Sequence, residues 1–115
     1  MIHNDMFEKI TEIFMKMLLY QLEEINSKIT ELFDNVNQKA AGNDEMKERL
    51  LKIRNDLHKI QSRAEQNVLA AKKDIAQASP ELIENAQLSI LELKRAYDEA
   101  RGKLAIIFEM EDFRE

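Results

Sequence analysis

The sequence predicts an all-α fold, an antiparallel up-down-up bundle of three long helices with coiled-coil-like seams. Three observations predict it: apolar residues recur every three or four positions, only two points in 115 residues interrupt that pattern, and the chain holds just 2 Gly and 1 Pro. So few glycines and prolines are typical of long uninterrupted helices rather than of a sheet with many tight turns. A chain of this length is expected to form a single domain, residues 1–115.

The first helix is expected over residues 5–41. Asp5 followed three residues later by Glu8 resembles a capping box and marks its start. Gly42 suits the left-handed position just past a helix end. Steps of mostly four and three residues predict the packing face of this helix: Met6, Ile10, Ile13, Met17, Leu18, Leu22, Ile25, Ile29, Leu32 and Val36.

The second helix is expected over residues 44–78 and the third over 80–113. Asn43 suits the N-cap of the second, and Ser79 suits the N-cap of the third, with Pro80 where a missing N–H is harmless. Their predicted packing faces are Met46, Leu50, Ile53, Leu57, Ile60, Ala64, Val68, Ala71, Ile75 and Ala78, and then Leu82, Ala86, Ile90, Leu93, Tyr97, Ala100, Leu104 and Ile107. Both connections are short, which favours antiparallel neighbours.

Composition excludes several classes of function. The absence of Cys excludes disulfides and thiolate chemistry, and the net charge of −5 argues against a nucleic-acid binder, which would carry a basic stripe. The longest apolar-rich stretch, residues 13–22, contains Lys16 and is about half of the roughly 20 residues that a membrane span needs. The first residues lack the pattern of a secretory signal. We therefore expect a cytoplasmic protein without a transmembrane segment.

Few residues in the chain are suited to chemistry. Helical bundles that hold metals use Glu-x-x-His motifs, and the nearest approach, Asn55 with His58, has an amide in place of the carboxylate. There is no Gly-rich loop to bind phosphate. We therefore expect no enzyme activity, no metal and no cofactor.

His58 suggests an alternative function, because it is expected to be exposed near the middle of the second helix. A surface histidine in the middle of a helical bundle resembles the histidine phosphotransfer domains. Those domains usually place Lys three residues and Gly four residues after the histidine, whereas this chain has Gln61 and Ser62, so only the small residue is kept. The resemblance implies phosphoryl transfer through His58, and the other interpretation is an ordinary surface histidine.

Two stretches carry more apolar residues than a three-helix bundle buries. About three apolar positions in seven are enough for such a helix, yet eight of the ten residues 13–22 are apolar, as are all of residues 104–108. The topology places these stretches at opposite ends of the bundle. We expect them to bind another protein or a second copy. The candidate residues are Phe14, Met15, Leu18, Leu19, Ile106, Phe108, Met110 and Phe113.

The favoured function is thus a non-enzymatic protein–protein interaction module, such as an adaptor, a small chaperone or an inhibitor. Whether the bundle also pairs into a homodimer is left open by the sequence. One alternative explains the bulky residues structurally, as filling space beside the small residues Ala64, Ala70, Ala71 and Ala76. Another is a coat on an apolar surface such as a lipid or polymer inclusion.

Charged substitutions at Leu19 and Ile106 test the binding hypothesis. They are expected to lower self-association or partner binding, measured by light scattering and pull-down, and to leave the helical circular dichroism unchanged. Loss of the fold itself would identify these residues as ordinary core.

Overall fold

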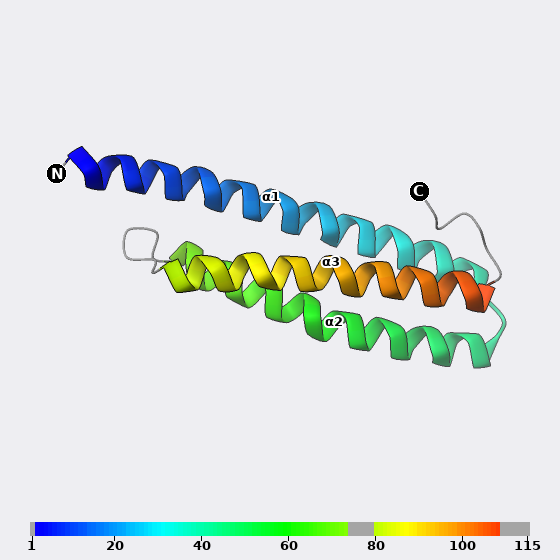
Figure 1. Cartoon of the computed structure of the whole chain (residues 1–115). Helices are drawn as coiled ribbons and strands as arrows, with labels where there is room; N and C mark the ends of the chain where they lie inside the picture. Colours follow the sequence, from blue (N-terminus) through cyan, green and yellow to red (C-terminus); the bar gives the residue numbers. More distant parts are fainter. Residues whose placement is uncertain (1, 74–79, 109–115) are drawn as a thin grey trace.

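The structure, a computed structural model, describes residues 2–73 and 80–108, which form three helices (Figure 1). These are α1 (Ile2–Lys39), α2 (Asp44–Lys73) and α3 (Pro80–Phe108). Helix α2 runs antiparallel to its two neighbours, so α1 and α3 point in the same direction. The predicted all-α, up-down-up bundle is confirmed.

The helix ends differ from the prediction by a few residues. Helix α1 begins at Ile2, so the prediction that Asp5 caps it is wrong. No Gly or Pro interrupts residues 2–4, and the helix continues through them. It ends at Lys39, two residues before the expected end. The expected ends of the other helices, at residues 78 and 113, and the expected cap Ser79 lie outside the described residues.

The turn between α1 and α2 forms as its residues predict. Gly42 adopts φ 85°, the left-handed conformation that glycine reaches without a steric penalty. The side-chain Oδ1 of Asn43 accepts a hydrogen bond of 3.1 Å from the backbone N–H of Met46, which makes Asn43 the N-cap of α2. Asp44 and Glu45 follow in the first turn, at the positive end of the helix dipole.

A single apolar core runs along the bundle axis, with one face of each helix turned toward it. The faces predicted for α2 and α3 are confirmed over the described residues, because each predicted position there is either buried or at least partly buried. The fully or almost fully buried apolar side chains of these two helices are Leu50, Leu57, Ala64, Val68, Ala71, Ala86, Ile90, Leu93, Ala100 and Leu104.

The face predicted for α1 is right in the second half of the helix and wrong in the first. Residues from Leu18 to Val36 on the predicted line are buried, but the four before them, Met6 to Met17, are 55–61% exposed. The buried line continues instead through Met15 and Thr11, three and then seven residues before Leu18. The first half of α1 carries two apolar lines, and periodicity alone does not say which of them faces the core.

Two sets of polar contacts fix how the helices are aligned. Between α1 and α2, Gln61 Nε2 donates to Asn26 Oδ1 at 2.7 Å, and Asn26 Nδ2 donates to Glu65 Oε1 at 3.3 Å. Between α2 and α3, Asn67 donates to the hydroxyl of buried Ser89, which donates in turn to the backbone carbonyl of Asn85. Sliding or rotating a helix would break these half-buried contacts, so they hold one register.

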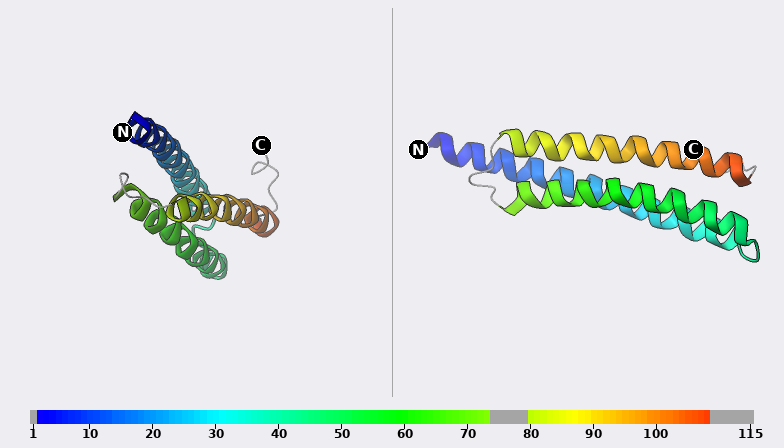
Figure 2. Two further views of the ribbon diagram at one scale, coloured as in Figure 1. Left: turned by 60° about the vertical axis from the view of Figure 1, so that its left-hand side comes forward. Right: turned by 90° about the horizontal axis from the view of Figure 1, so that it is seen from below.

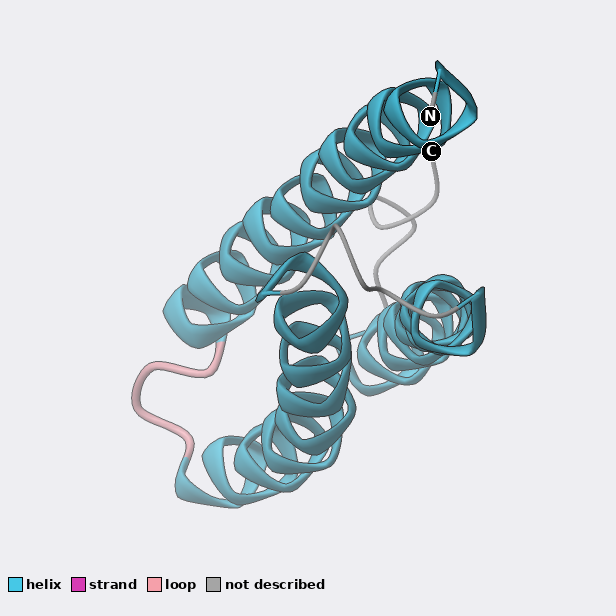
Figure 3. Cartoon of the chain, turned by 90° about the vertical axis from the view of Figure 1, so that its left-hand side faces the viewer, coloured by secondary structure: helices cyan, strands magenta, loops and turns pink. Residues whose placement is uncertain are grey.

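Helix α1 diverges from the other two helices toward its N-terminus. In the view of Figure 1, α1 is drawn apart from α3 where α3 starts and close to it where α3 finishes, and the views of Figure 2 show that the two helices cross at an angle. Figure 3, seen from the end where α3 starts, shows α1 leaning away from the α2–α3 pair. The first half of α1 is therefore the part of the bundle with the least complete cover from its neighbours.

Replacing Leu93 or Leu91 with Ala measures how strictly one face of α3 is core. Leu93 is 0% exposed and Leu91 is 52% exposed. Leu93→Ala is expected to lower the free energy of unfolding by about 2–5 kcal/mol, whereas Leu91→Ala is expected to change it by about 0.5 kcal/mol or less. Urea unfolding followed by circular dichroism measures both, and equal losses would contradict this packing.

Candidate partner-binding surface

The N-terminal half of α1 carries an exposed line of large apolar side chains, which we call the outer stripe. Its members follow one another in steps of four, three, four and three residues, the spacing of a coiled-coil seam. At about 100° per residue, the stripe lies about 140° around the helix from the buried line. Its five side chains are between 55% and 68% exposed: Met6, Ile10, Ile13, Met17 and Tyr20.

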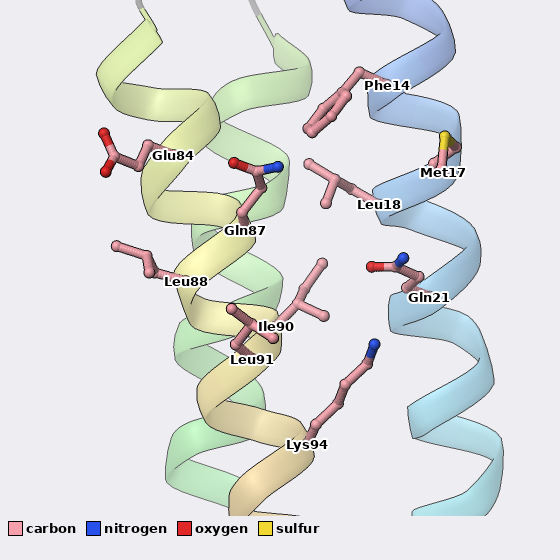
Figure 4. A pocket seen from close by; sticks show the side chains of 10 residues that line it. All are labelled: Phe14, Met17, Leu18, Gln21, Glu84, Gln87, Leu88, Ile90, Leu91 and Lys94. Atoms are coloured by element: carbon pink, nitrogen blue, oxygen red, sulfur yellow. The ribbon is translucent and has the colours of Figure 1, made fainter.

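A groove of about 450 Å³ lies between α1 and α3 beside this stripe (Figure 4). Phe14 and Leu18 point into it from α1, and Ile90 lies between the two helices. We call this the α1–α3 groove. Its complete lining is Phe14, Met17, Leu18, Gln21, Glu84, Gln87, Leu88, Ile90, Leu91 and Lys94. Six of these ten side chains are large and apolar, so the groove is suited to burying apolar groups.

The stripe and the groove form one continuous surface. Met17 belongs to the stripe and also lines the groove. A second hollow of about 270 Å³ extends the groove along the same two helices, and it shares Gln21 and Lys94 with the first. The lining changes along this direction from apolar to mostly polar, so the apolar part lies toward the start of α1.

Exposed apolar side chains of α1 and α3 lie together on this surface. Leu88 and Leu91 of α3 are 55% and 52% exposed, so together with the stripe this surface carries seven large apolar side chains that are more than half exposed. Gatherings of exposed apolar side chains are typical of interaction sites. Leu51 and Leu69 of α2 are also exposed, but as single side chains, which is ordinary for a protein surface.

Part of the predicted α1 site proves to be core. Met15 is 1% exposed and Leu18 is 4% exposed. The expectation that Met15 lies on an exposed surface is therefore wrong, and Leu18 only closes the floor of the groove. Phe14 and Leu19 are half-buried and pack against the core. A charged side chain at Leu19 is consequently expected to disturb packing as well as binding.

The predicted C-terminal site contributes a single exposed side chain among the described residues. Ile106 is 79% exposed, whereas Phe108 is half-buried and packs against the core. Met110 and Phe113 lie outside the described residues. As expected, this stretch lies at the opposite end of the bundle from the start of α1 (Figure 1). It therefore does not extend the surface described above.

The space-filling alternative explains some of the bulky residues of α1. Ala64 and Ala71 of α2 are fully buried in the same core as Met15 and Leu18, so small and large side chains do share that core. Ala70 is exposed, and Ala76 lies outside the described residues. The alternative accounts for the buried line of α1 but not for the outer stripe.

His58 is exposed on the outer side of α2, as the sequence predicts. Three residues later, the side chain of Gln61 is directed toward α1, where it bonds Asn26 at 2.7 Å. Ser62 is half-buried. These neighbours neither favour nor oppose phosphoryl transfer, so the exposure of His58 is its one supporting observation.

Residues 2–73 and 80–108 offer few features that suit other kinds of site. Within those ranges no group of three or more His, Asp or Glu is placed to hold a metal ion. Among the same residues, no helix combines the length and the apolar character that crossing a membrane requires. Nor does any buried side-chain nitrogen or oxygen there lack a hydrogen-bond partner.

The sequence predicts only part of this surface. The apolar stretch 13–22, which is expected to bind a partner, contains Ile13, Met17 and Tyr20 of the stripe. However, Met6, Ile10, Ile13 and Met17 are also predicted to lie on the packing face, and Leu88 and Leu91 belong to no predicted site. One signal was present: the predicted line passes from Met17 to Leu18, a step of one residue that no single helix face allows. That step separates two lines, of which only one continues into the rest of the helix.

Met15 and Met17 form a matched pair that separates core from stripe. Met15→Glu places a carboxylate in the core and is expected to lower the free energy of unfolding by about 3 kcal/mol or more. Met17→Glu is expected to change it by about 0.5 kcal/mol or less, because the side chain is 55% exposed. Thermal and urea unfolding measure both values. A large loss for Met17→Glu would show that the stripe is covered.

Comparisons of the chain with protein-family models, with curated proteins and with solved structures found no match.

Proposed function

We propose that this chain is a non-enzymatic protein–protein interaction module, such as an adaptor, a small chaperone or an inhibitor. It acts by burying an apolar segment of another protein, or of a second copy, against the outer stripe and the α1–α3 groove. The observation that carries this proposal is the outer stripe itself: five large side chains at coiled-coil spacing, all more than half exposed.

Such a stripe supports a binding function because exposed apolar side chains do not contribute to the stability of an isolated molecule. Burying one side chain of this size stabilises the buried state by roughly 1.5–3 kcal/mol, and the stripe lacks most of this stabilisation while it is exposed to water. Exposed apolar patches of this kind are typical of interaction sites. The spacing is also informative, because steps of four and three residues present a straight seam to a second helix.

The groove supports binding rather than catalysis. Its lining consists of apolar side chains, two Gln, one Glu and one Lys, and it contains no His. Glu84 and Lys94 lie ten residues apart on α3, near opposite ends of the groove in Figure 4, so they do not form an acid–base pair. Methionine at position 17 suits an adaptable contact surface, because its side chain repacks easily.

Substituting the stripe while sparing the core tests the proposal. Ile13→Glu with Met17→Glu is expected to abolish capture of a partner from the native cell extract, or to abolish self-association. The matched control is Leu69→Glu on α2, which is 58% exposed against 60% for Ile13 and 55% for Met17. The control is expected to retain binding, and both variants are expected to keep the helical spectrum and the unfolding midpoint.

The measurements are mass by light scattering and quantitative comparison of the captured proteins. Binding that is unchanged in the double variant, or that falls equally in the control, would mean that the stripe does not carry the function. A monomer that captures nothing in any form would also contradict the proposal.

A further inference from the structure

We infer that the occupant of this surface is an amphipathic helix of another protein, with acidic side chains bordering its apolar face. This inference rests on the proposed function and specifies the partner's chemistry. It is carried by the shape of the groove and by the charges along its two edges.

The shape of the groove fits a helix. The groove and its extension run from Phe14 to Lys28 on α1 and from Glu84 to Asp98 on α3. Each side spans 15 residues of helix, and the 14 steps between the first and the last correspond to about 21 Å, or nearly four turns. The surface also provides a straight apolar seam beside a hollow, which is how helix-in-groove recognition operates. A partner helix would complete the bundle with a fourth element at the end where α1 diverges.

Basic side chains border the apolar stripe along the α1 edge of the surface. If the stripe occupies the a and d positions of a heptad, Lys9 and Lys16 occupy the g positions that border it. Both lysines are exposed, and among the described residues neither forms an ion pair, not even Lys16 with Glu12. The next g position is Glu23, beyond Tyr20, where the apolar stripe has ended.

The α3 edge is also basic toward the polar part of the groove. Lys94 reaches across the groove toward α1 in Figure 4 and forms no ion pair with any described residue. Arg95 follows Leu91 on the exposed side of α3. The other charges of this part are balanced within the chain, since Lys28 lies 3.7 Å from Glu24, and Asp98 lies 3.6 Å from Arg101.

One acidic residue, Glu84, lines the groove at the end opposite Lys94. The unpaired charges along the two edges therefore sum to a basic surface in a chain whose net charge is −5. Lysines that flank an apolar seam select partners with acids at the facing positions, because e and g charges determine partner choice. The local charge thus favours an acidic partner even though the molecule as a whole is acidic.

A second copy of the chain fits this surface less well. If two stripes paired antiparallel, the g positions of the two helices would face each other and bring Lys9 and Lys16 together. If they paired in parallel, each lysine would face Phe14 or Gln21 of the other copy. In the antiparallel register shifted by one heptad, Lys9 faces Glu23 but Lys16 still faces Lys16, so no orientation places a negative charge opposite both lysines.

A bilayer surface fits less well for a different reason. Anionic lipids attract lysines beside an apolar stripe, but a flat surface does not fill a hollow of about 450 Å³. The ridge of side chains along a helix does fill such a hollow.

Two designed peptides test the inference on the full chain. Each has 21 residues in three heptads, about 30 Å of helix, with Leu at a and d; one carries Glu and the other Lys at e and g. We expect the Glu peptide to bind at least about tenfold tighter by fluorescence anisotropy at low salt. We expect this preference to shrink as salt is added. The charge-reversed variant with Lys9→Glu, Lys16→Glu and Lys94→Glu is expected to prefer the Lys peptide, with an unchanged circular dichroism spectrum.

The other outcomes overturn the inference in distinguishable ways. Equal binding of the two peptides, abolished by Ile13→Glu with Met17→Glu, would remove the acidic preference and leave the proposed function intact. A dimer that this double variant dissociates, with no peptide binding, would identify a second copy as the occupant. Binding only to vesicles of phosphatidylcholine and phosphatidylglycerol would identify a membrane. A monomer that binds no peptide and no vesicle would remove the inference and the proposed function together.

Discussion

The limited number of neighbours around α1 is the constraint on which the rest of this molecule depends. A helix in a three-helix bundle has two neighbours, and they cover one face of it. The first half of α1 presents apolar side chains on two faces about 140° apart. The buried face, through Met15 and Leu18, satisfies the bundle, and the other remains as the outer stripe. The divergence of α1 and the adjacent groove belong to the same incompletely covered end.

The stripe stays outside because the second half of α1 determines how the whole helix is rotated. Turning α1 to bury Met6 and Met17 would expose the core residues from Leu22 to Val36, which are at most 7% exposed. It would also break the contacts of Asn26 with Gln61 and Glu65. A regular helix rotates about its axis as one rigid body, so the longer of its two apolar lines determines which face packs in the core. Conflicts between local pattern and global packing of this kind concentrate at functional sites.

Most of the fold was predictable from local signals, but the surface only in part, because the apolar stretch 13–22 was identified without the line of exposed side chains that runs through it. Gly42 and Asn43 predicted the first turn, and Pro80 the start of α3, because each residue has a specific backbone role. The stripe could not be separated from the core by sequence alone, because the same apolar residue types occur on a face that packs in the core and on a face that binds a partner. The buried line was hard to recognise in the sequence because it includes a polar residue, Thr11, whose side chain is only 4% exposed. The groove depends on how far α1 diverges from α3, and spacing in one helix carries no information on that distance.

Binding at this surface would also act on the stability of the fold. The floor of the groove is formed by Leu18 and Ile90, which belong to the core, so a docked side chain would contact the interior of the bundle directly. Any partner that binds the folded chain alone shifts the equilibrium toward it. The added stability would act at the end where α1 is least covered by its neighbours, whereas α2 and α3 are already joined by the hydrogen bond between Asn67 and Ser89. A partner bound at the proposed surface would therefore add to the stability of the end of the bundle where the packing of α1 is least complete.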